Sequence, residues 1–268
     1  MEDEVGFKMK MMFNIIFRPF IYAKNIIYEG LYSGRDVQKF HNYNNLYSLG
    51  YSVMKEKLSH ADINLLRKDF ELLQTNSKFE EKGQLSGRLY EHGPISELSK
   101  KYIGKYRPIA EAYFSSKRIH CELTMYQKSW PKAKIDDVPG GEFHEDDSKR
   151  NLKFFIYLTD VDKNSGPFCY VPRTHGLRKS EKYFRWLLWE IFHERKYLYN
   201  YKLNTKECEE DEIQILGSAG TCFCCDTTGY HRAAMPLNQN REVFVVSFTR
   251  SSKVDYLLNK IKILFGIR

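Results

Sequence analysis

Residues 151–176, "NLKFFIYLTDVDKNSGPFCYVPRTHG", carry the clearest structural pattern in the chain. A run of strand-forming residues spans 151–161, and a Gly-Pro turn, a short strand and a second turn follow it. Comparable strand-like runs are "HCELTMYQKSW" at 120–130, "AGTCFCCDTTGYH" at 219–231 and "REVFVVSFTR" at 241–250. Short strands separated by turn signals are typical of a β-sandwich or β-barrel.

The first half of the chain is predicted to be more helical than the second. Apolar residues at helical spacing follow a start signal at Ser59 or His60, just after a short strand at 51–54. A second helix is predicted over roughly 95–118, with an interruption near Pro108. Residues 180–206 are predicted to form a helical insertion between strands. The fold class is therefore α+β with a mainly β core, in a single domain over 1–268.

Composition indicates a globular protein with a basic surface. The chain has 268 residues, 42% of them hydrophobic, which suits one large domain. Its formal net charge of +8 favours anionic partners, although simple solubility explains it equally well. No nucleic-acid-binding signature is found, so no nucleic acid is expected as a partner. The "CFCC" run at 222–225 lacks zinc-ligand spacing, and the six cysteines suit a reducing, cytoplasmic compartment.

The two ends of the chain are predicted to be appended segments. Residues 1–35 form a basic, aromatic leader whose apolar runs are too interrupted to span a bilayer. A segment packed on the domain is favoured over one lying on a membrane surface, because apolar stripes usually face a core. Residues 251–268 are predicted to form an amphipathic helix.

The stretch "GGEFHEDDSKR", residues 140–150, raises the question of a metal site. In an extended segment, residues two apart point to the same side, so His144 and Asp146 can converge on one ion. Glu145 and Asp147 would then point away. Taken alone, the pair is more simply interpreted as part of a polar loop.

A third ligand and a cosubstrate anchor occur further along the chain. His231 follows a predicted strand, and two histidines with one carboxylate form the facial triad of non-haem Fe(II) oxygenases. Arg241 begins the next strand, where a planar guanidinium would match the far carboxylate of 2-oxoglutarate. Because the triad and Arg241 are together what such a site requires, we favour this interpretation over an arginine exposed at the end of a strand.

Several other residues are weaker candidates. Tyr126 precedes the metal loop and could donate its hydroxyl to 2-oxoglutarate, although a packed strand tyrosine is the simpler alternative. Phe155 is expected to line the cosubstrate pocket. Lys153 shares a strand face with Tyr157 and could bind an anionic substrate, with a solvated lysine as the alternative.

Supporting roles are expected for residues around these candidates. His175 in "PRTHG" is expected to brace a turn, and Asp226 to support the strand before His231. The cysteines of the 222–225 run are expected to be core residues near the iron, with some exposure to metal-driven oxidation.

Four motifs in matching order resemble the phytanoyl-CoA dioxygenase family of Fe(II)/2-oxoglutarate oxygenases. The resemblance covers about 48–250 and rests on "GYSVMKEKLSHADINLLRKDF", "FHEDD", "FFIYLTDVDKNSGPFCYVPRTHG" and "DTTGYHRAAMPLNQNR". It implies a double-stranded β-helix, or jelly roll, with flanking helices.

The same resemblance implies iron at His144, Asp146 and His231, and 2-oxoglutarate at Arg241. Arg173 departs from the family pattern, which usually has glycine there, and this puts the shape of that turn in doubt. Because Asp146 is present, a halogenase, which would lack that carboxylate, is disfavoured.

The sequence therefore predicts a dioxygenase that uses Fe(II), 2-oxoglutarate and O₂. We expect it to hydroxylate a small-molecule or carrier-linked substrate, with an anionic one favoured by the net charge, and to release succinate and CO₂. Two alternatives are a zinc-type hydrolase or isomerase using the same triad, and a catalytically silent jelly-roll binding module. The sequence does not indicate an oligomeric state.

Overall fold

A computed structural model of the chain describes residues 43–76, 80–82, 86–131, 140–146, 151–175 and 205–250. The predictions for the leader at 1–35, the helical insertion at 180–206 and the terminal helix at 251–268 lie outside these ranges. None of the helices in the described ranges is long and apolar enough to cross a membrane.

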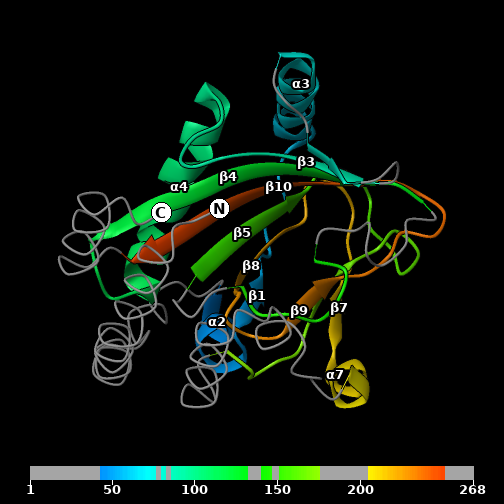
Figure 1. The fold of residues 1–268 in the computed structure, drawn as a ribbon. Helices are drawn as coiled ribbons and strands as arrows, with labels where there is room; N and C mark the ends of the chain where they lie inside the picture. Colours follow the sequence, from blue (N-terminus) through cyan, green and yellow to red (C-terminus); the bar gives the residue numbers. More distant parts are fainter. Residues whose placement is uncertain are drawn as a thin grey trace, which may run out of the picture.

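The core is built from two antiparallel sheets (Figure 1). In spatial order, the seven-stranded sheet comprises β1 (Tyr51–Val53), β8 (Cys222–Asp226), β5 (Asn151–Tyr157), β10 (Arg241–Arg250), β4 (Ile119–Ser129), β3 (Ser86–Glu91) and β2 (Glu80–Lys82). The three-stranded sheet comprises β7 (Ile213–Ile215), β6 (Phe168–Tyr170) and β9 (His231–Ala233). This is the jelly-roll architecture, and the predicted fold class is confirmed.

The large sheet is buried on both faces. One face packs against the helices α3 (His60–Asn76) and α4 (Glu97–Tyr113), which lie on the opposite side of the large sheet from β7 and β9 in Figure 1. Side chains alternate along each strand, so Phe244 of β10 belongs to the helix-side cluster and Val243 to the cluster facing the small sheet. Because both clusters exclude water, the central strands β5 and β10 carry apolar side chains on both faces.

The helix starts follow ordinary capping rules. The Ser59 hydroxyl accepts a hydrogen bond from the Asp62 amide at 3.1 Å, which caps α3 where the sequence predicts its start. Ser96 and Ser99 form a reciprocal capping box at the start of α4.

The predicted interruption near Pro108 is wrong, because α4 runs without a break from Glu97 to Tyr113. Pro108 has no N–H group, so the Gly104 carbonyl lacks its usual hydrogen-bond donor in the helix. Both residues are exposed, so water can hydrogen-bond to that carbonyl. Buried tyrosines on the opposite side hold the helix against the sheet, and the Tyr106 ring stacks on Phe154 with centroids 4.4 Å apart.

Gly50 fixes the turn between α2 (Asn44–Leu49) and β1. Its φ of 85° is left-handed, and a Cβ atom there would lie 2.3 Å from the Tyr170 hydroxyl and 2.4 Å from His175 Nδ1. We expect Gly50→Ala to lower the free energy of unfolding by about 2–4 kcal/mol in denaturant titrations. Gly104→Ala is the control: nothing lies near its Cβ position, and the change should stabilise α4 by up to about 1 kcal/mol. A Gly50→Ala protein as stable as wild type would contradict this account.

Candidate metal centre

The structure brings His144, Asp146 and His231 together. Their ligand atoms all lie within 4.8 Å of one another. His144 and His231 exchange two backbone hydrogen bonds of 3.0 Å, and the Asp146 amide donates to the Thr227 carbonyl at 2.9 Å. The loop at 140–146 is thus tied along its backbone to the segment that carries His231.

Both imidazoles are oriented through their outer nitrogens. Nδ1 of His144 lies 2.7 Å from the Glu142 carbonyl, and Nδ1 of His231 lies 2.9 Å from the Gly229 carbonyl. A carbonyl only accepts, so each Nδ1 carries the proton and each Nε2 keeps a free lone pair. The Nε2 atoms lie 3.8 Å and 3.6 Å from oxygens of Asp146, for His144 and His231 respectively. This is the tautomer that a metal ion requires.

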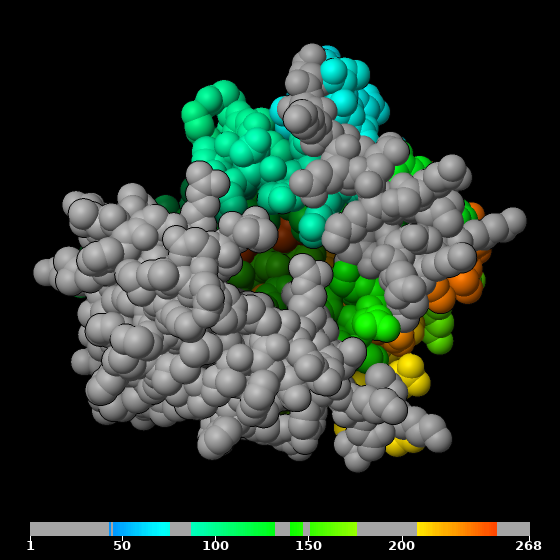
Figure 2. All heavy atoms as spheres, viewed as in Figure 1, coloured from blue at the N-terminus to red at the C-terminus, as the bar shows by residue number. Residues whose placement is uncertain are grey.

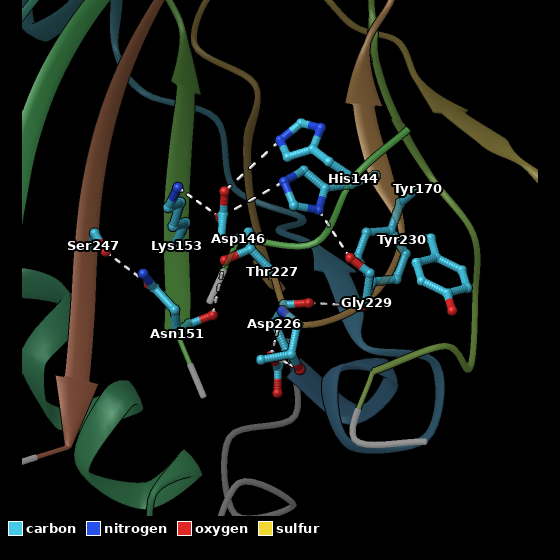
Figure 3. Close-up of polar contacts among 12 residues, drawn as sticks. His144, Asp146, Asn151, Lys153, Tyr170, Asp226, Thr227, Gly229, Tyr230 and Ser247 are labelled. Atoms are coloured by element: carbon cyan, nitrogen blue, oxygen red, sulfur yellow. Dashed lines mark hydrogen bonds and ion pairs between the residues drawn. The ribbon is translucent and has the colours of Figure 1, made fainter. Parts of the chain in front are cut away.

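The charge state of the site also suits a cation. Burial, together with the neighbouring His231, lowers the pKa of His144 to about 4, so its imidazole is neutral at physiological pH. Burial alone would raise the pKa of Asp146, but Lys153 and His231 outweigh it and hold that pKa well below its ordinary value. The Lys153 ammonium lies 2.7 Å from Oδ2 of Asp146, and Figure 3 shows Lys153 and His144 on opposite sides of this carboxylate.

Gly140 allows the metal loop to pack closely. It has a φ of 73°, and a Cβ atom there would lie 2.7 Å from Cε1 of the His144 ring. Its carbonyl accepts a hydrogen bond of 2.7 Å from the Ala233 amide. The first glycine of "GGEFHEDDSKR" therefore has a direct steric reason at this position.

Asp226 supports the turn before His231. Its carboxylate is fully buried and accepts hydrogen bonds from the Tyr113 hydroxyl at 2.5 Å and the Thr228 hydroxyl at 2.6 Å. Its backbone carbonyl accepts from the Gly229 amide at 3.0 Å. Through Tyr113, helix α4 is thereby linked to the segment that carries a candidate ligand. Figure 3 shows Asp226 in the turn that leads to Gly229.

The three ligand candidates open onto a cavity of about 420 Å³. In the space-filling view, atoms of β5 and β10 are visible at the bottom of a hollow (Figure 2). The large sheet contributes to its lining Arg88, Tyr90, Leu123, Met125, Gln127, Lys153, Phe155, Tyr157, Arg241 and Val243. The cavity is therefore bounded by the sheet face opposite the helices.

Arg241 lies in this cavity at the start of β10 and is buried. Its guanidinium donates to the Gly166 carbonyl, and a second nitrogen lies 3.4 Å from the Ser129 hydroxyl. Phe155 lines the same cavity and stacks on Phe223 with centroids 4.8 Å apart. Both residues therefore line the cavity onto which the three ligand candidates open.

Tyr126 does not lie where it was predicted. It belongs to the helix-side cluster, where its ring stacks on Phe70 and its hydroxyl donates to Asp69 at 2.7 Å. The expectation that it contacts 2-oxoglutarate is corrected by this placement. Its strand neighbour Gln127 faces the cavity instead, with a buried Nε2 that has no hydrogen-bond partner among the described residues. The sequence interpretation missed Gln127, because alternation alone does not show which of two adjacent strand residues faces the cavity.

The supporting residues occupy structural positions. Nε2 of His175 lies 3.0 Å from the Tyr47 carbonyl, so this histidine braces the turn against α2. Arg173 keeps the left-handed backbone that glycine would take, with a φ of 66°, and its amide donates to the Leu49 carbonyl at 2.9 Å. The turn whose shape was in doubt is therefore retained.

The three cysteines of β8 are buried and carry no disulfide. Burial raises the pKa of the Cys224 and Cys225 thiols well above their ordinary values, which keeps both protonated. They behave as core residues, as the sequence indicates.

A jelly roll with two histidines and one carboxylate at the mouth of an internal cavity defines the architecture of a non-haem iron oxygenase. The family model for phytanoyl-CoA dioxygenase (PhyH) matches residues 50–241, and the chain belongs to this family. The family comprises 2-oxoglutarate-dependent oxygenases that use Fe(II) and O₂. A search of curated proteins finds no significant match by sequence.

Solved structures share the fold at low identity. The non-haem α-ketoglutarate-dependent carbocyclase SnoK from nogalamycin biosynthesis is 16% identical, covers 82% of this chain and 90% of its own, and gives a TM-score of 0.59. HygX from Streptomyces hygroscopicus, solved with nickel and 2-oxoglutarate, is 12% identical with coverages of 79% and 87% and a TM-score of 0.54. EctD from S. alaskensis, solved with bound Fe, is 13% identical with coverages of 78% and 76% and a TM-score of 0.58.

Proposed function

We propose that the protein is an Fe(II)- and 2-oxoglutarate-dependent dioxygenase that hydroxylates a small-molecule or carrier-linked substrate. The observation that carries this proposal is the convergence of His144, Asp146 and His231 within 4.8 Å on a cavity that also contains Arg241. A triad of this composition leaves open metal positions for a cosubstrate and O₂.

The donor set fits ferrous iron. Two neutral imidazoles with free Nε2 atoms and one carboxylate offer nitrogen and oxygen ligands, and no cysteine among the described residues joins the group. The outer nitrogens are held by carbonyls of Glu142 and Gly229, the arrangement that fixes ligating histidines in metalloproteins. His144, Asp146 and His231 would hold the ion.

The cavity offers a binding place for 2-oxoglutarate. Arg241 would bind its far carboxylate. The Gln127 amide, whose Nε2 has no partner within the described part of the chain, would donate a further hydrogen bond. Phe155 and Phe168 form an apolar wall that excludes water between the metal end and the arginine. Bound iron would supply the oxidation chemistry, in which 2-oxoglutarate, O₂ and the substrate are converted to succinate, CO₂ and the hydroxylated substrate.

Opposite faces of β4 provide a test of the cosubstrate site. Tyr126→Phe should leave 2-oxoglutarate affinity unchanged within about twofold and lower the free energy of unfolding by about 1 kcal/mol, because only the bond to Asp69 is lost. Gln127→Leu, one residue further along, should weaken 2-oxoglutarate binding about tenfold. Equilibrium dialysis with the Mn(II)-loaded protein measures both. A larger effect in Tyr126→Phe than in Gln127→Leu would contradict the proposed placement.

The substrate would occupy the cavity next to β3 and β4. Leu123, Met125 and Tyr90 provide apolar surface there, with Arg88 on β3 and His92 directly after that strand. Carbocyclase and epimerase structures share this fold, so the fold does not distinguish hydroxylation from these reactions. We propose hydroxylation because it is the usual reaction of Fe(II)/2-oxoglutarate oxygenases.

The alternatives fit the described residues less well. Asp146 is the only carboxylate among the described residues that line the cavity, which leaves no acid beside the metal to act as the general base of a hydrolase. A silent binding module has no use for oriented imidazoles or for a buried arginine aimed into the same cavity.

An anaerobic titration tests the proposal. Apo-protein is loaded with Fe(II) and then with 2-oxoglutarate while visible absorbance is recorded, and a charge-transfer band from the chelated keto acid is expected. Succinate should replace the keto acid when a substrate and O₂ are added. A folded, iron-loaded wild-type protein that shows no band with saturating 2-oxoglutarate would refute the proposed function.

A further inference from the structure

Lys153 is a cation inside the candidate active site. It lies on β5, on the strand face that also carries Phe155 and Tyr157, and its side chain is 16% exposed. Its ammonium contacts Oδ2 of Asp146 at 2.7 Å, and no other ion pair is found for it among the described residues. The lysine therefore lies at the metal end of the cavity, away from Arg241 on β10.

The charges of the loaded site leave this ammonium without a full counter-charge. The dication and the 2-oxoglutarate dianion balance each other, and the cation of Arg241 balances the anion of Asp146. Lys153 then remains, because no other carboxylate is found among the described lining residues. Arg88 adds a further cation to the same cavity, with its guanidinium carbon 5.3 Å from the centre of the Tyr90 ring.

A metal ion also weakens the hold of Asp146 on the lysine. Once the carboxylate donates electron density to a dication, it attracts a neighbouring ammonium less strongly. A largely buried ammonium is unfavourable unless another anion or acceptor approaches it. The flexible lysine stem allows the charge to turn from Asp146 into the cavity while its backbone stays in β5.

We propose that Lys153 binds an anionic group of the substrate, a carboxylate or a phosphate, and so holds the substrate beside the metal. The inference rests on the proposed function and deepens it, since it assigns the substrate class of the same site. A substrate that presents an ammonium group at this position would be repelled by Lys153. A neutral analogue would lose the charge-assisted hydrogen bond.

Paramagnetic relaxation tests this inference directly. The protein is loaded with Mn(II) and saturating 2-oxoglutarate, and the relaxation rates of small probes are measured by NMR. The probes are ¹³C-acetate and inorganic phosphate, each beside a neutral counterpart, ¹³C-acetamide and trimethyl phosphate. The variants are Lys153→Gln and Lys153→Arg. Lys101→Gln is the matched control, because Lys101 also pairs with an aspartate at 2.7 Å but on the helix surface.

We expect wild-type protein to enhance the relaxation of at least one anion over its neutral counterpart. Lys153→Gln should lower that enhancement about tenfold, while Lys153→Arg and Lys101→Gln should largely keep it. Stronger relaxation of acetate identifies a carboxylate ligand, and stronger relaxation of phosphate identifies a phosphate ligand. An enhancement that persists in Lys153→Gln means that the anion binds elsewhere and overturns the inference, as does equal relaxation of charged and neutral probes.

The Fe(II)/2-oxoglutarate absorbance band separates this inference from the proposed function. Its absence in wild-type protein refutes the proposed function, whatever the probes show. A wild-type band together with no preference for anions overturns the role of Lys153 alone. Loss of the band in Lys153→Gln but not in Lys153→Arg would show that the lysine serves to position Asp146, and would also overturn the inference.

Discussion

Replacing His231 with alanine is expected to abolish the Fe(II)/2-oxoglutarate absorbance band and to lower turnover about a thousandfold or more. His231 is buried, and its Nε2 lies 3.6 Å from Asp146, so its loss removes one of three candidate ligands. Removing a residue that only hydrogen-bonds to a metal ligand lowers metal affinity or activity about 10–100-fold, and removing the ligand itself lowers them further. Titration of the variant with Fe(II), followed by metal analysis after gel filtration, measures the effect.

The backbone of the variant should stay intact. The two hydrogen bonds that join positions 144 and 231 use main-chain atoms, which alanine retains. His120→Ala serves as the control, since His120 is exposed on β4 and pairs with Thr249 outside the cavity. A His231→Ala protein that binds iron and shows the band as wild type does would eliminate the assigned triad.

Replacing Arg241 is expected to weaken 2-oxoglutarate binding about 100-fold in Arg241→Met and about tenfold in Arg241→Lys. The methionine keeps much of the buried volume and removes the charge, whereas the lysine keeps the charge and loses the two-pronged geometry. Iron binding without 2-oxoglutarate should be unchanged, because Arg241 is not among the clustered metal-ligand candidates. The dependence of band intensity on 2-oxoglutarate concentration gives the dissociation constants.

Arg232→Met is the matched control for this series. Its guanidinium pairs with Glu212 at 2.9 Å and 3.0 Å, and it does not line the cavity. Loss of this ion pair should lower the stability of the protein and leave the dissociation constant for 2-oxoglutarate within about twofold of the wild-type value. If Arg232→Met and Arg241→Met weakened 2-oxoglutarate binding equally, the effect would be a general loss of packing and Arg241 would not be the anchor.

The convergence of the metal residues could be predicted because it depends on local geometry. His144 and Asp146 lie in an extended segment, where alternation places them on one side without knowledge of the rest of the fold. His231 could be added because its chemistry completes a known ligand set. For Lys153, the sequence left two interpretations open: a contact with an anionic substrate, or a lysine exposed to solvent. Its contact with Asp146 depends on two segments meeting, which periodicity in one strand does not show.

Tyr126 was misplaced for a related reason. Around Tyr126 the strand is buried or partly buried on both faces, so the alternation of polar and apolar residues that marks an outer face is weak in "HCELTMYQKSW". Tyrosine and glutamine were both chemically reasonable contacts, and only the pairing of β4 with its neighbours decides which one faces the cavity. Strand register sets that choice, and it is a property of the assembled sheet.

The shorter elements were missed because they have almost no periodic signal. The strands β7 and β9 contain three residues each, too few for an alternation pattern. Pro108 was misjudged because a helix break depends on whether the freed carbonyl is exposed to water and on how strongly the opposite side is packed. Neither property is visible in the sequence around the proline.

The paired backbone hydrogen bonds between His144 and His231 have a consequence for how the protein gains and loses its ion. The main chain, and not the metal, holds the two histidines at a fixed separation, so folding alone assembles most of the site. Added metal should therefore raise the unfolding temperature by mass action and should not be required for the fold to form. We therefore expect the protein to stay folded when its metal is removed, and to rebind the metal afterwards.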